Sequence, residues 1–130
     1  MKEINELIEL SQYNHKLDLK RGQKEYLSLE WALNEIKAEV QEVKEELKPN
    51  NIPKIEDELG DILWGFFMSI EKFKYDGYEV DVKRVIKRAL KKYKERVLPL
   101  KGEVKVDREI WDRVKKKQKI ELEKEIEGRV

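Results

Sequence analysis

The chain has 130 residues, enough for one domain with a sizeable core and too few for two. Charged residues make up 44% of it, but the net charge is only +1, which excludes a polycation that binds nucleic acid through bulk electrostatics. The absence of cysteine excludes disulfides, zinc–thiolate sites and thiol nucleophiles.

The helical spacing of apolar residues predicts the class of the fold. No convincing strand pattern of period two is present, so we expect an all-α bundle of about five helices in a single domain over residues 1–130. The N-terminal stretch lacks the basic and apolar segments of a signal peptide, and no apolar run approaches the ~18 residues of a membrane span. We therefore expect a cytoplasmic protein with no membrane partner.

The first expected helix covers residues 3–17. His15, the only histidine, lies near its end. A surface position is the commonest one for such a residue, and contact with a substrate is the less common alternative. Residues 18–23 contain the breaker Gly22 and are expected to form a loop.

Ser28 is the expected N-cap of a second helix that reaches Lys48. Apolar residues form one stripe along this helix, and glutamates form a second stripe about 100° away. The members of the acidic stripe are Glu35, Glu39, Glu42 and Glu46. Glutamates four residues apart each destabilise a helix by about 0.2–0.5 kcal/mol, so we expect something else to neutralise this face.

The third helix is expected from Lys54 to about Tyr75, and its middle is apolar on nearly all sides. A chain this short can barely enclose such a helix, so we expect a homodimer or higher homo-oligomer with this helix near the interface. Glu58 and Asp61 line the edge of its apolar stripe.

Acids from the second and third helices converge if the two helices pack antiparallel through their apolar stripes. The four residues are Glu39, Glu42, Glu58 and Asp61. Acids gathered in this way, with no interleaved base to pair them, suit a hard divalent cation. Mg²⁺ fits best because it binds through carboxylates together with substrate phosphates, and Mn²⁺ is the alternative ion.

A fourth helix is expected to begin after the N-cap Asp81 and to carry a basic row. The row recurs every four residues and consists of Arg88, Lys92 and Arg96. Its spacing fits either a solvated face or a phosphate-binding face, and other cations surround it. A last amphipathic helix is expected over residues 107–127.

Clustered carboxylates and cations, without a nucleophilic Ser, Cys or His dyad, point to metal-assisted hydrolysis of a phosphoanhydride. In this interpretation the four acids hold the metal and one of them activates water, while the basic row holds phosphate. Trp31 lies beside the acidic stripe and is a candidate for contact with the substrate, although burial in the core is commoner for tryptophan. The alternative is a non-catalytic charged helical interaction module whose acids are solvated.

Two acidic segments resemble a known signature. The order AEVQEV, a turn and loop, then DELGDILW resembles the MazG-like nucleoside triphosphate pyrophosphohydrolases, whose signature is EExxE followed by ExxD. It maps onto the residues that resemble the Mg²⁺ ligands of that family, namely Glu39, Glu42, Glu58 and Asp61. The run over 88–97 is similar to the family's KANxKFxxRF, which makes Arg88, Lys92 and Arg96 the matched basic residues. Residues 111–115 are similar to its WExxK.

The resemblance implies an all-α enzyme, active as a dimer or higher oligomer, that converts NTP or dNTP to the monophosphate and pyrophosphate in nucleotide-pool house-cleaning. Two positions depart from the pattern. Ala38 replaces the first acid of EExxE, with Glu35 one turn away, and Leu90 replaces the motif's Asn. Dimeric dUTPases and phosphoribosyl-ATP pyrophosphatase belong to the same helical superfamily and are the rival enzymes.

Overall fold

The computed structural model describes residues 1–128, and in that range it contains six α-helices and no strand. The predicted all-α class is therefore confirmed. The chain divides into two compact units, Met1–Val82 and Lys83–Val130. A single domain over residues 1–130 and a homo-oligomer stay predictions. None of the helices described within residues 1–128 is long and apolar enough to cross a membrane.

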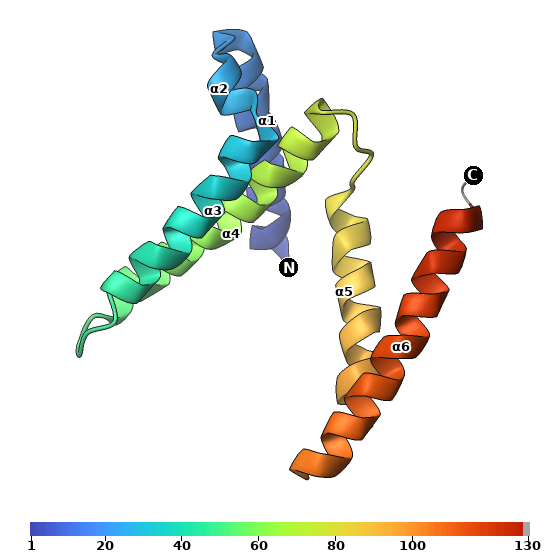
Figure 1. Cartoon of the computed structure of the whole chain (residues 1–130). Coiled ribbons are helices and arrows are strands. Elements are labelled where there is room, and N and C mark those ends of the chain that lie inside the picture. Colours follow the sequence, from blue (N-terminus) through green and yellow to red (C-terminus); the bar gives the residue numbers. More distant parts are fainter. Residues whose placement is uncertain (129–130) are drawn as a thin grey trace. The chain divides into compact units, whose positions relative to one another are not determined.

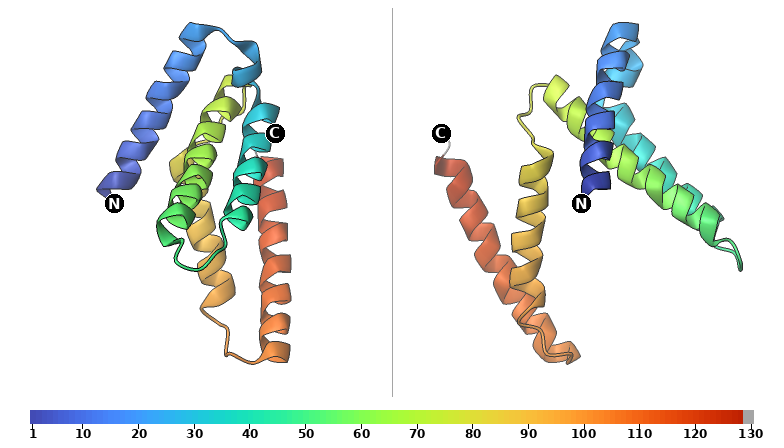
Figure 2. Two further views of the ribbon diagram at one scale, coloured as in Figure 1. Left: turned by 90° about the vertical axis from the view of Figure 1, so that its left-hand side faces the viewer. Right: turned by 180° about the vertical axis from the view of Figure 1, so that it is seen from behind.

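The first unit contains four helices. They are α1 (Lys2–Arg21), α2 (Lys24–Leu27), α3 (Leu29–Glu45) and α4 (Ile52–Tyr75). As Figure 1 and Figure 2 show, α3 and α4 run antiparallel side by side, and α1 packs against α4. Ile8, Ala32, Phe67 and Ile70, from α1, α3 and α4, are buried in this unit. The later part of the apolar stretch of α4 thus lies in the core of this unit.

α1 is longer than predicted and ends at Arg21. Gly22 follows with a left-handed φ of 66°, and its N–H donates to the carbonyl of Asp18 at 3.1 Å. The prediction of a loop from residue 18 was wrong because Asp18 is held within the helix by contacts with another element. Its carboxylate accepts a hydrogen bond from Lys72 of α4 at 2.8 Å.

His15 is buried, so the expectation of a surface histidine was wrong. Its Nδ1 lies 2.8 Å from Lys72 Nζ, and its ring meets the edge of Tyr75 with centroids 5.8 Å apart. Both partners lie on α4, far from His15 in the sequence, so no local pattern around His15 reveals them.

The seam between α3 and α4 positions the acidic residues. The predicted N-cap of α3 is confirmed, because the side chain of Ser28 accepts a hydrogen bond from the N–H of Trp31 at 3.2 Å. Farther along the seam, a Cβ at Gly65 would lie only 3.1 Å from Ile36 Cγ1. Glycine at position 65 therefore allows the two helices to approach closely just beyond the acids.

The second unit is an antiparallel hairpin of α5 (Val82–Val97) and α6 (Val104–Gly128). Among its described residues, Arg96 and Ile110 are buried. The Arg96 guanidinium lies 5.2 Å from the ring centre of Trp111, and its Nε donates to Gln118 at 2.8 Å. Polar and aromatic contacts therefore join the two helices of the hairpin.

Candidate functional site

Four carboxylates meet at the seam between α3 and α4. They belong to Glu39, Glu42, Glu58 and Asp61, and one oxygen from each lies within 4.8 Å of the others. The two acids of each helix are three residues apart and so lie on one face of it. Antiparallel packing turns the two acidic faces toward each other, and the convergence expected from the sequence is observed.

Two carboxylate oxygens of this acidic cluster, Glu39 Oε2 and Glu58 Oε2, are buried and have no hydrogen-bond partner. Burial first, and the neighbouring carboxyl group of Glu42 second, raise the pKa of Glu39 to about 7. The same causes raise the pKa of Glu58. None of the ion pairs within residues 1–128 involves a member of the cluster.

This arrangement fits a hard divalent cation. Buried polar atoms are almost always satisfied, so orphaned carboxylate oxygens call for a cation or a proton. Mg²⁺ and Mn²⁺ prefer carboxylate oxygen and readily take additional ligands from substrate phosphates. The cluster therefore provides what a cation bound together with a phosphate ester requires. Glu35, one turn before Glu39, lies outside the group of four converging carboxylates.

A pocket of about 520 Å³ adjoins the acidic cluster and is lined by residues of α1, α2, α3 and α4 and by Gln23 before α2. Glu39 and Asp61 of the cluster contribute to its wall, as does Trp31. Glu39, Glu35 and Trp31 recur every four residues on α3, so they form a row about 12 Å long. The pocket thus extends from the carboxylates to an aromatic side chain, and its volume is typical of a small-molecule site.

The part of the pocket that α1 supplies was not predicted from the sequence. Asn14 and Asp18 line this side, and Gln23 lines it from the loop that follows α1. Asn14 and Asp18 are four residues apart and share a helix face, a signal that the predicted loop over 18–23 concealed.

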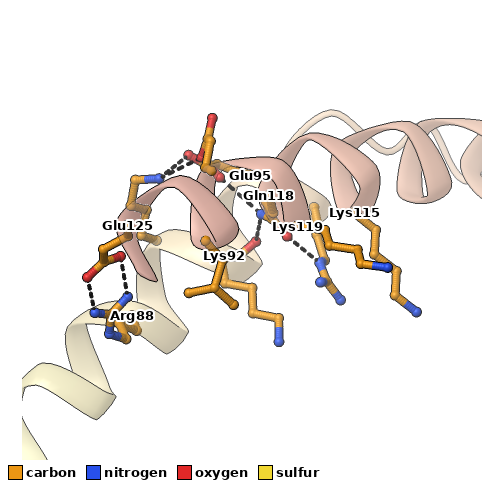
Figure 3. Close-up of a pocket in the computed structure, with 11 residues that line it drawn as sticks. Arg88, Lys92, Glu95, Lys115, Gln118, Lys119 and Glu125 are labelled. Carbon is orange, nitrogen blue, oxygen red and sulfur yellow. Dashed lines mark hydrogen bonds and ion pairs between the residues drawn. The ribbon is translucent and has the colours of Figure 1, made fainter. Parts of the chain in front are cut away.

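The predicted basic row lies in the second unit, on α5. Arg88 forms an ion pair with Glu125 of α6, and Lys92 lies with its Nζ 5.6 Å from the ring centre of Tyr93. All three members of the row line a groove of about 550 Å³ between α5 and α6. Figure 3 shows Lys92 and Lys115 extending to the same side of the hairpin while Arg88 meets Glu125. The acids and the row belong to different units, so their joint action on one substrate stays a prediction.

Without a divalent cation, the acidic cluster is expected to destabilise the fold as the pH rises through 7. The pKa of Glu39 is about 7 in the folded protein, whereas an unperturbed glutamate, as in the unfolded chain, has a pKa of 4.5. Between these pH values the folded chain binds more protons than the unfolded chain. The stabilisation of the fold by protonated Glu39 is therefore complete below a pH of 4.5 and is lost above a pH of about 7. Glu39→Gln should remove most of this dependence.

Thermal denaturation of wild type and Glu39→Gln in chelator, at a series of pH values, measures the effect. His15 acts in the opposite direction because burial and Lys72 lower its pKa, so the difference between variant and wild type at each pH is the informative quantity. A difference in melting temperature that does not change between about pH 5 and pH 8 would contradict the assignment.

Comparison with known proteins gives one match. The family model of the MazG nucleotide pyrophosphohydrolase domain matches residues 27–98. The matched segment runs from the end of α2 to the end of α5 and includes the acidic cluster, Trp31 and the basic row. No curated protein and no solved structure matches the chain.

Proposed function

The chain belongs to the MazG nucleotide pyrophosphohydrolase family, whose model covers more than half of it, and we propose that it hydrolyses NTPs or dNTPs to the monophosphate and pyrophosphate. A role in clearing unwanted nucleotides from the cellular pool accords with this reaction. The observation that carries the proposal is the acidic cluster, in which two buried carboxylate oxygens have no partner.

The four carboxylates of the cluster would hold Mg²⁺, with Mn²⁺ as a substitute. When bound, the cation supplies neutralisation of phosphate charge and stabilisation of the leaving group. A carboxylate of the cluster orients the attacking water or accepts its proton. The adjoining pocket takes the nucleoside and shields part of it from bulk water, with Trp31 as an aromatic wall. Basic residues of α5 hold the remaining phosphate charge.

A screen of all NTPs and dNTPs tests this function. Pyrophosphate and monophosphate should be released in equal amounts with Mg²⁺ or Mn²⁺, and chelator should stop the reaction. Turnover confined to dUTP, or to phosphoribosyl-ATP added to the screen, would favour one of the rival enzymes instead. No turnover of any nucleotide, with no rise in melting temperature when cation and nucleotide are added together, would favour the interaction module.

Lys92 provides the cleaner test of the phosphate role of α5. Lys92→Gln is expected to raise the KM for the triphosphate by about tenfold with a smaller change in kcat, because it removes one charge-assisted hydrogen bond. Arg96 is less suitable because its guanidinium also packs on Trp111, so its removal would loosen the hairpin.

Lys87→Gln is the matched control, since Lys87 is an exposed lysine of α5 that does not line the groove. The KM for the triphosphate and the affinity for the bare nucleoside should be measured for both variants. Equal losses for triphosphate and nucleoside, or equal effects of the two substitutions, would remove the phosphate role of Lys92.

A further inference from the structure

A buried lysine fixes one carboxylate of the pocket. Lys72 on α4 is 1% exposed, and its Nζ donates to Asp18 Oδ2 on α1 at 2.8 Å. Its second contact is His15 Nδ1, also at 2.8 Å. Burial and the charge of Lys72 lower the pKa of His15, so the imidazole is neutral and accepts at Nδ1. These contacts hold Asp18 in one orientation.

Asp18 remains open to the pocket. Its side chain is 17% exposed, and it belongs to the pocket wall together with the cluster acids Glu39 and Asp61. Arg21 donates to Asp18 Oδ1 at 3.1 Å, so each oxygen has one protein donor. A carboxylate has about four acceptor positions, which leaves acceptor capacity for a ligand.

Asp18 lies at the end of the pocket that is away from the acidic cluster. Its partner Lys72 lies 11 residues after Asp61 on α4, which is about 16 Å along the helix axis. Trp31, eight residues before Glu39 on α3, lies about 12 Å along its helix in the same direction. A nucleotide with its phosphates at the cluster would place its base near this end.

We propose that Asp18 accepts a hydrogen bond from the exocyclic amino group of the nucleobase, so that the pocket selects nucleotides of guanine, adenine and cytosine over those of uracil and thymine. This inference rests on the proposed hydrolysis of nucleoside triphosphates. Trp31 is 38% exposed and Trp64 is half-buried, and both line the same pocket, where they provide faces for the base.

The discrimination follows from the chemistry of the base edges. Guanine, adenine and cytosine carry an amino group that donates to a carboxylate, whereas uracil and thymine present carbonyl oxygens on both sides of their single ring N–H. A fixed carboxylate repels those carbonyls, which weakens any hydrogen bond from the ring N–H between them and disfavours uracil and thymine. We expect kcat/KM to be at least about tenfold higher for nucleotides whose base carries an amino group than for those of uracil and thymine. This preference is smaller than that of a fully buried site, because Asp18 is partly solvated.

Asp18→Asn tests the inference, because an amide can donate to a carbonyl as well as accept from an amino group. The variant should still release pyrophosphate, but its preference among dGTP, dATP, dCTP, dUTP and dTTP should fall to within about threefold. Glu9→Gln is the matched control, since Glu9 is an exposed acid of α1 outside the pocket, and it should keep the wild-type preference. An unchanged preference in Asp18→Asn would overturn the inference.

A second measurement uses the wild-type protein and needs neither turnover nor folding of a variant. Equilibrium dialysis with nucleoside monophosphates in chelator should show tighter binding of dGMP, dAMP and dCMP than of dUMP and dTMP. Hydrolysis of triphosphates with equal rates for all bases, or with a preference for dUTP, would overturn the role of Asp18 and leave the proposed function standing. Preferential binding of the amino-bearing monophosphates without hydrolysis of any triphosphate would support the pocket and overturn the proposed function.

Discussion

Glu42→Gln is expected to lower kcat/KM for nucleotide hydrolysis by at least about 100-fold while leaving the helical fold intact. Glu42 raises the pKa of Glu39 on its own helix and of Glu58 on α4, so it acts on both halves of the acidic cluster. An amide has the shape of the carboxylate but no charge for a cation. In chelator the same substitution should keep or raise the melting temperature, because it relieves repulsion among the acids.

The control for this prediction is Glu45→Gln, the same change on an exposed acid of α3 outside the cluster. Steady-state kinetics, circular dichroism and melting with and without Mg²⁺ should be compared for both variants. Glu42→Gln should lose the stabilisation by Mg²⁺ that Glu45→Gln keeps. Loss of helicity together with activity in Glu42→Gln would show that the cluster is structural, and full activity would show that Glu42 is not part of the site.

The acidic cluster was predictable because its information is local. Acids three residues apart on each helix, beside an apolar stripe, fix which face they occupy, and a short connection between α3 and α4 makes the two faces meet. The all-α class followed from the same periodicity. The cap at Ser28 was predictable for a similar reason, since its bond to Trp31 spans three residues.

The α1 side of the pocket could not be predicted in this way. Lys72 is separated from Asp18 by 54 residues and from His15 by 57, and their contacts exist only because α1 packs on α4. Helix signals around Gly22 placed the helix end too early, because tertiary contacts override weak local propensity. The burial of Arg96 has the same origin, since its partners Trp111 and Gln118 lie on α6.

Lys72→Ala is expected to cost about 3 kcal/mol of unfolding free energy, a large part of the stability of a small domain. The substitution leaves a cavity where a side chain that is 1% exposed had been, and it removes the donor of both Asp18 Oδ2 and His15 Nδ1. Lys72→Met fills most of the cavity and should cost less than Lys72→Ala. Asp18 keeps Arg21 and some solvent in either variant, which limits the charge penalty.

Urea unfolding of wild type, Lys72→Ala and Lys72→Met at several pH values separates packing from charge. In the wild type, burial first and Lys72 second lower the pKa of His15, so the folded chain binds fewer protons at this group and stability falls as the pH drops through 6.5. Lys72→Met removes the charge but retains the burial, so its loss of stability on the acid side should be smaller than that of the wild type. Nearby Asp18 also favours protonated His15 once Lys72 is gone. If the stability of Lys72→Met fell with decreasing pH as steeply as that of the wild type, the charge of Lys72 would have no effect on His15. A Lys72→Ala variant as stable as the wild type would contradict the buried network itself.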